Sequence, residues 1–180
     1  MEQTGEGFLF APKANQRITH IARLKNAQES VDFFFRAIDP LRTSRRIGPV
    51  LFQLPPNLKA DVALLNDFLP LLPRDLRHAF EYRHESWLND SVYEVLRKHN
   101  AALCLAESEK LEIPQIVTAD FVYCRLRMPE YTPQQRAAIA DRASEWIASG
   151  RDVFLFFKHE ESPEGALYAE EILQRCRAAA

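Results

Sequence analysis

The sequence predicts an α/β fold built on a parallel β-sheet. Short apolar runs rich in β-branched and aromatic residues alternate with segments of helical periodicity, which is the pattern of parallel strands joined by crossover helices. The chain has 180 residues, of which 47% are hydrophobic and 27% charged, and this composition is typical of a globular protein with one substantial core. We therefore expect a single domain over residues 1–180.

Apolar runs predict the strands, and helices are expected between them. The first helix opens at Glu29 or Ser30, and Asp61 is expected to cap the second. A third helix starts at Asp90 or Ser91. The expected strands lie at residues 8–11, 49–53, 78–81, 102–105, 121–124 and 153–157.

The last two helices carry start and stop signals. Thr132 followed by Pro133 is typical of a cap and a first helical residue, and Gly150 is expected to end that helix. A final helix is expected from Pro163 to about Cys176.

Parallel strands with helical connections form either an open doubly wound sheet or a (β/α) barrel. A glycine-rich phosphate loop would favour the open sheet, and the five glycines form none. Polar residues instead follow several strands, and a barrel assembles its site from many strand ends in this way. A complete barrel needs about 250 residues. The sequence therefore predicts a partial TIM barrel with about six βα units visible and roughly two missing. The polar strand-end residues are Lys13, Gln53, Glu81, Arg83, Glu107, Arg125, Arg127, Lys158 and His159.

Composition limits the partners that the sequence indicates, and it does not exclude nucleic acid. The formal net charge is −2, so the whole-molecule charge does not indicate nucleic acid or an anionic membrane, and any anion site must be local. The polar N-terminus and the short apolar runs predict a cytoplasmic protein without a membrane partner. Cysteines at 104, 124 and 176 are too widely spaced for a zinc knuckle, no metal-ligand spacing is recognised, and no pattern identifies a cofactor.

The most informative segment is AFEYRHESW at residues 79–87, where an apolar run changes abruptly to charged residues. Because side chains alternate along a strand, Glu81 and Arg83 are expected on one face and His84 on the other. A carboxylate and a guanidinium would then emerge together at the strand end. The alternative is an ion pair that only ties a loop to the barrel.

The chain resembles the DUF72 (YecE-like) family of uncharacterised proteins, whose fold is a TIM barrel variant. Relative to that family, the chain begins just before what would be the third strand. The resemblance implies the barrel fold and a candidate site, but no reaction. It rests on FLFAPKANQRITH at 8–20, GPVLFQLPPNLK at 48–59, AFEYRHESW at 79–87, TADFVYCRLR at 118–127 and VFLFFKHEESPEGALYAEEIL at 153–173.

Two motifs depart from the family pattern, and both departures add charge. Arg125-Leu126-Arg127-Met128 stands where the family commonly has Arg-Leu-His-Gly. Phe-Lys-His-Glu at 157–160 stands where many members have Phe-Asn-Asn-Asp.

Basic residues at the strand ends predict an anion site at the mouth of the barrel. Arginine forks bind carboxylate or phosphate at two points, so a phosphate ester or a nucleic-acid backbone is the simplest ligand. The alternative is an internal layer of salt bridges between these arginines and the strand-end glutamates. The expected ligand-binding residues are Lys13, His20, Gln53, Arg83, His84, Arg125, Arg127 and Lys158.

Glu81 and Glu107 are the candidate catalytic residues, because two carboxylates in one shielded pocket can act as an acid and a base. A hydrolase or lyase acting on a phosphorylated or nucleic-acid substrate is the leading hypothesis. The alternatives are a non-catalytic module that binds an anion or nucleic acid, and an inactive truncated gene product. In the truncated form, open sheet edges near Phe10 and Phe156 would favour self-association.

Overall fold

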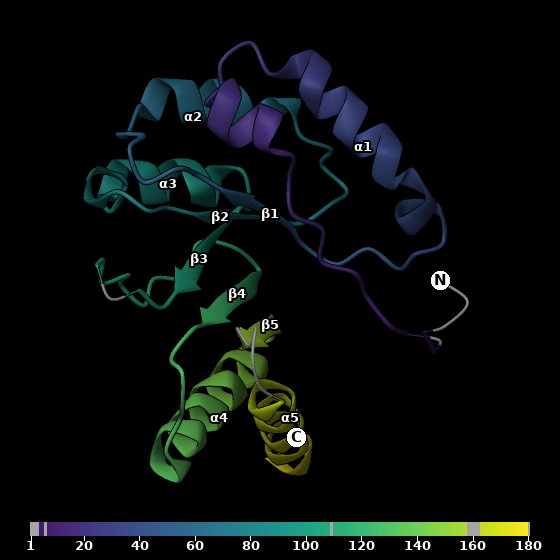
Figure 1. Ribbon diagram of the computed structural model, residues 1–180, viewed down its shortest axis with the longest axis vertical. Helices are drawn as coiled ribbons and strands as arrows, with labels where there is room; N and C mark the ends of the chain where they lie inside the picture. The colour runs from purple at the N-terminus through teal and green to yellow at the C-terminus, as the bar shows by residue number, and fades with distance from the viewer. Residues whose placement is uncertain (1–3, 6, 109, 158–162, 180) are drawn as a thin grey trace.

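A computed structural model describes residues 4, 5, 7–108, 110–157 and 163–179. Its centre is a five-stranded parallel sheet in which each strand pairs with the next one along the chain. The sheet curls into part of a barrel with helices on its outer side (Figure 1), so the predicted α/β partial TIM barrel is confirmed. The strands are β1 (Val50–Gln53), β2 (His78–Glu81), β3 (Ala102–Ala106), β4 (Phe121–Leu126) and β5 (Asp152–Phe157).

The first expected strand is absent, so the prediction of six strands was wrong by one. The chain there instead makes two isolated parallel bridges, Phe10 to Ile47 ahead of β1 and Lys13 to Leu51 within it. The register slips by one residue between these bridges, and Pro12 lies in that interval. Proline has no N–H to donate to a ladder, which accounts for the interruption. The bridge at Lys13 still places this residue beside the sheet.

Helix boundaries follow local capping chemistry closely. Asp61 caps its helix as expected and accepts from the backbone N–H of Leu64. Thr132 and Gln135 form a capping box ahead of Pro133. The helices are α1 (Gln28–Thr43), α2 (Val62–Phe68), α3 (Asp90–Lys98), α4 (Pro133–Ala148) and α5 (Glu164–Ala179), with the short turns η1 (Arg17–Ile21), η2 (Leu69–Leu71) and η3 (Glu85–Trp87).

The crossover from β3 to β4 is different, because its described residues in 107–120 contain no helix. Thr118 fixes its far end: the hydroxyl donates to the Ala101 carbonyl at 2.7 Å and accepts from the Leu103 N–H at 2.8 Å. The helix layer is therefore interrupted. Helices α1–α3 lie over one part of the sheet and α4–α5 over another (Figure 1).

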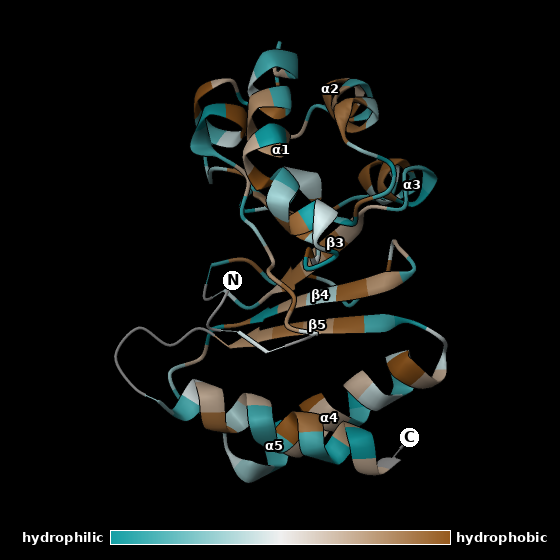
Figure 2. Ribbon diagram, turned by 90° about the vertical axis from the view of Figure 1, so that its right-hand side faces the viewer, coloured by the Kyte–Doolittle hydropathy of each residue, from teal (hydrophilic) through white to brown (hydrophobic). Residues whose placement is uncertain are grey.

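Two apolar clusters lie on opposite faces of the sheet. The outer cluster joins strand residues such as Leu103, Leu105 and Cys124 to the helices, and the inner cluster contains Cys104 and Tyr123. Strands and helix faces that meet at the outer cluster are strongly hydrophobic (Figure 2). Since side chains alternate, every second residue at a strand end points into the barrel mouth.

Among the described residues, no helix is both long enough and apolar enough to cross a membrane.

Candidate functional site

The carboxylate of Glu81 is the centre of the barrel mouth. Glu81 is 1% exposed, and hydrogen-bond donors surround its carboxylate. Gln53 Nε2 lies 2.9 Å from both carboxylate oxygens. Arg83 Nε, Arg125 Nη1 and Arg127 Nη2 donate to it at 3.1, 2.5 and 2.9 Å respectively. We call these five residues, with Lys13, the arginine mouth.

Strand register assembles the arginine mouth. Gln53 and Glu81 are directly paired at the ends of β1 and β2, and their side chains point into the barrel. Arg125 is paired with Ala106 of the inner cluster, so it points to the same side. Lys13 Nζ donates to Gln53 Oε1 at 3.4 Å and extends the network to the segment beside β1.

The ionisation of Glu81 is set by its neighbours. Burial alone would raise the pKa of this carboxyl, but Arg125, the hydrogen bond from Gln53 and Arg127 together lower its pKa below the ordinary value. Glu81 is therefore an anion at neutral pH. With all its donors in place, it orients the arginines and is poorly suited to accept a proton.

Positive charge exceeds negative charge at this mouth. Arg83, Arg125 and Arg127 contact the carboxylate of Glu81, and Lys13 joins the same network through Gln53. The side chains of the three arginines keep 36, 26 and 23% of their surface exposed. Arg127 Nε is buried and has no hydrogen-bond partner among the described residues. The arrangement thus leaves guanidinium donors directed at the mouth after Glu81 is satisfied.

His20 lies on η1, a single π-helical turn beside the mouth. Burial lowers its pKa, and the charges of Lys13, Arg83 and Arg23 lower it further, so the imidazole is neutral at neutral pH. Its Nδ1 is 2.8 Å from the Thr19 hydroxyl. Turns of this kind occur often at functional sites.

Arg23 was missed by the sequence analysis. Its guanidinium donates to Asn57 Oδ1 at 3.2 Å, which ties the loop after η1 to the loop after β1. The backbone here is unusual, because Arg23 and Leu24 have φ values of 51° and 67°. Nothing in the local sequence marks this left-handed pair, since neither residue is glycine or asparagine.

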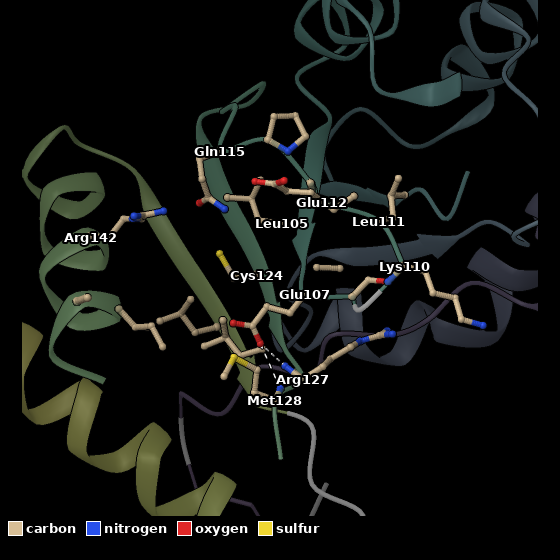
Figure 3. A pocket seen from close by; sticks show the side chains of 18 of the residues that line it. Leu105, Glu107, Lys110, Leu111, Glu112, Gln115, Cys124, Arg127, Met128 and Arg142 are labelled. Carbon is tan, nitrogen blue, oxygen red and sulfur yellow. Dashed lines mark hydrogen bonds between the residues drawn. The ribbon is translucent and has the colours of Figure 1, made fainter. Parts of the chain in front are cut away.

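Glu107 lies on the other face of the sheet from Glu81. It follows the last residue of β3, and Leu105, which points the same way, belongs to the outer cluster. Glu107 Oε2 accepts from the backbone N–H groups of Arg127 at 2.6 Å and Met128 at 3.2 Å (Figure 3). It also accepts from the Tyr131 hydroxyl.

The structure therefore does not bring Glu107 into the arginine mouth. Proton exchange between Glu81 and Glu107 stays a prediction. Tyr131, also missed by the sequence analysis, is held by the same contact; burial first, and then the bond to Glu107, raise its pKa well above the ordinary value.

The contacts of His84 and of nearby Trp87 are structural ones. His84 Nδ1 accepts from the Ser86 N–H at 3.2 Å and so caps η3. Trp87 is fully buried and donates from Nε1 to the Leu58 carbonyl at 2.7 Å, which makes it a core residue. Lys158 and His159 lie outside the described residues. Within the described part of the chain, no group of three His, Cys, Asp or Glu side chains is arranged to hold a metal ion.

Parallel strands that curl part of the way round an axis, with polar side chains gathered at their carboxyl ends, define a partial TIM barrel. The family described as "Protein of unknown function DUF72" matches residues 1–180, and the chain belongs to that family.

Solved structures of DUF72 family proteins share this fold. One from Thermotoga maritima has a TM-score of 0.86 and 23% identity, over 98% of this chain and 76% of that chain. One from Enterococcus faecalis has a TM-score of 0.80 and 17% identity, over 96% of this chain and 80% of that chain. No curated protein matches the sequence.

Proposed function

We propose that the arginine mouth binds a phosphate-containing anion. The observation that supports this most directly is the charge balance, because three arginines contact the one carboxylate of Glu81 and Lys13 adds a fourth cation through Gln53. Guanidinium groups bind phosphate oxygens through paired N–H donors, and these bonds are stronger than neutral ones. A bound dianion would neutralise most of the excess charge at the mouth.

In this proposal, Glu81 and Gln53 position the donors and the cations bind the ligand. Glu81 fixes one N–H of each arginine, so the remaining donors are oriented before the ligand arrives. A preorganised site loses less side-chain entropy on binding. Lys13 is exposed, and its ammonium adds a second type of donor at the rim.

A small phosphorylated molecule fits the charge distribution better than a nucleic acid does. The chain as a whole carries a formal charge of −2, so the positive charge is confined to the mouth. A nucleic-acid-binding surface normally carries an extended basic stripe. Binding of an oligonucleotide is therefore an outcome that the experiment below must be able to detect.

A hydrolase or lyase reaction on the bound ligand is a second proposal. His20 favours it, because an imidazole that is neutral at neutral pH and lies beside bound phosphate can accept a proton. We expect His20→Asn to retain ligand binding and to abolish any release of nitrophenol from p-nitrophenyl phosphate. If wild-type protein and His20→Asn released nitrophenol at the same rate, His20 would have no part in the reaction.

Isothermal titration with inorganic pyrophosphate tests the binding proposal. The variants are Lys13→Gln, at an exposed cation, and Arg125→Gln, with Arg97→Gln on α3 as a control for loss of an exposed arginine. Losing one charge-assisted contact costs about 1.5–3 kcal/mol, so affinity should fall about tenfold or more in the first two variants only.

Thermal melting of each variant identifies any loss of fold, and Lys13→Gln carries the test if Arg125→Gln unfolds. Binding should also weaken as salt is raised. The proposal fails if wild-type protein shows no heat of binding, or if all three variants bind alike. Tighter binding of a single-stranded oligonucleotide than of pyrophosphate would instead identify a nucleic-acid site.

A further inference from the structure

A cavity of about 890 Å³ lies between the β3–β4 crossover and α4, outside the arginine mouth (Figure 3). We call it the crossover cavity. Its cause is the missing helix: the crossover packs as an extended segment, so the outer face of β3 and β4 is covered only by loop residues and by one side of α4. Its volume lies in the range of about 300–1,000 Å³ that is typical of small-molecule sites.

The walls of the crossover cavity are mainly apolar. Its floor consists of outward-facing strand side chains that belong to, or pack against, the outer cluster. Helix α4 contributes the half-buried Trp146, whose indole gives a flat contact surface. The principal apolar lining residues are Leu105, Cys124, Leu155, Ile139, Trp146 and Ile113.

Charge at the cavity is unevenly distributed. Glu107 is held by backbone donors and Tyr131, and Arg127 directs its guanidinium to Glu81 in the mouth. Lys110 and Glu112 come from the crossover.

Arg142 differs from Glu107 and Arg127, while the opposite charges of Lys110 and Glu112 cancel in the local net charge. It projects from α4 toward the cavity (Figure 3) and has no ion pair or hydrogen bond among the described residues. Burial raises the pKa of the Cys124 thiol to about 12, and the Arg142 guanidinium, which lines the same cavity, opposes that shift. An unpaired cation beside an apolar cavity complements an anionic group attached to an apolar body.

We propose that the crossover cavity binds an amphipathic organic anion, whose apolar body packs against Leu155 and Trp146 and whose acidic group pairs with Arg142. Acyl-chain and aromatic acids share this chemistry. The site is separate from the arginine mouth, because it lies on the opposite face of the sheet and uses a different free cation.

Anilinonaphthalene sulfonate is a direct probe, because it combines an aromatic body with an anionic head and fluoresces when it leaves water. We expect saturable binding to the native protein, with quenching of Trp146 fluorescence that Trp146→Phe removes. Arg142→Gln should weaken binding about tenfold, and Arg142→Lys should recover part of the loss. Arg97→Gln on α3 is the matched control and should bind like wild type.

Ala138→Phe gives a second, independent test, since Ala138 is exposed on α4 and lines the cavity. A phenyl ring there should abolish binding without changing thermal melting. Dodecanoate and naphthoate should compete with the probe, and the stronger competitor identifies acyl or aromatic ligands. Pyrophosphate should not compete. Absence of wild-type binding, or equal binding by Arg142→Gln, Ala138→Phe and wild type, would overturn the proposal; if Ala138→Phe unfolds, Arg142→Gln decides alone.

Discussion

Replacing Glu81 with glutamine tests whether one buried carboxylate holds the arginine mouth together. In wild-type protein, the carboxylate receives donors from three arginines while its own side chain is 2% exposed. The Glu81→Gln side chain has nearly the same volume but no charge. The three guanidinium groups would then face one another without a counter-ion, and their mutual repulsion would act on the ends of β2 and β4.

Breaking a buried ion pair by removing one partner costs about 3–5 kcal/mol. The arginine side chains are 23–36% exposed, so water screens part of the repulsion and the lower limit is appropriate. We therefore expect Glu81→Gln to lower the free energy of unfolding by about 3 kcal/mol. For a chain of this size, the corresponding fall in Tm is about 6–12 °C.

Urea unfolding at neutral pH measures this loss, with Glu85→Gln, at an exposed residue of the same segment, as control. The loss also depends on pH. Because the folded-state pKa of Glu81 is below its unfolded value, its contribution is complete above about pH 4.5 and is lost as the pH falls through the folded pKa. The difference between wild type and Glu81→Gln should therefore shrink in acid.

Added pyrophosphate should stabilise Glu81→Gln more than wild type, because the variant's arginines lack a counter-ion. A loss of stability below about 1 kcal/mol, the value typical of surface pairs, would refute the account of Glu81 as the organising group.

Burial lowers the pKa of His78 to about 4, against a usual value of 6.5. The contribution of His78 to the free energy of unfolding should thus be complete above about pH 6.5 and fall by about 3 kcal/mol toward pH 4. Urea titrations of His78→Leu should lack that pH dependence. An unchanged profile would exclude His78 as the source of the pH dependence. Thr118→Val removes the hydroxyl bonds to Ala101 and Leu103, and urea unfolding should show a loss of about 2 kcal/mol, which a neutral result would contradict. The edge strand β5 carries Phe156, 36% exposed, so we expect light scattering to show concentration-dependent dimers that Phe156→Lys abolishes; a wild-type monomer at all concentrations would disprove this.

Local chemistry explains which parts of the fold were predictable. Caps at Asp61 and Thr132 use side-chain bonds within one helical turn, so the sequence carries the whole signal. The segment at 8–11 has strand composition, but pairing depends on a neighbour distant in sequence and on Pro12. The helix missing from the β3–β4 crossover likewise reflects tertiary packing that short-range periodicity does not record.

Strand parity explains which parts of the candidate site were predictable. Glu81 and Arg83 are two residues apart, so their common face follows directly from the sequence. Glu107 follows a strand that is apolar on both faces, and such a strand has no alternation to show which face is inner. A shift of one residue moves a side chain to the opposite face of a sheet. Grouping Glu107 with Glu81 therefore required a parity that only the three-dimensional structure supplies.

Arg127 connects the two faces of the sheet. Its guanidinium contacts Glu81 in the arginine mouth, while its backbone N–H donates to Glu107 at the crossover cavity. The charged motif at 125–127 thus does more than add charge to the mouth. Glu107, which Tyr131 contacts in turn, holds the backbone of Arg127, and Glu81 holds its guanidinium. The two strand-end glutamates therefore have one structural task in common, which is to orient the cations of the arginine mouth.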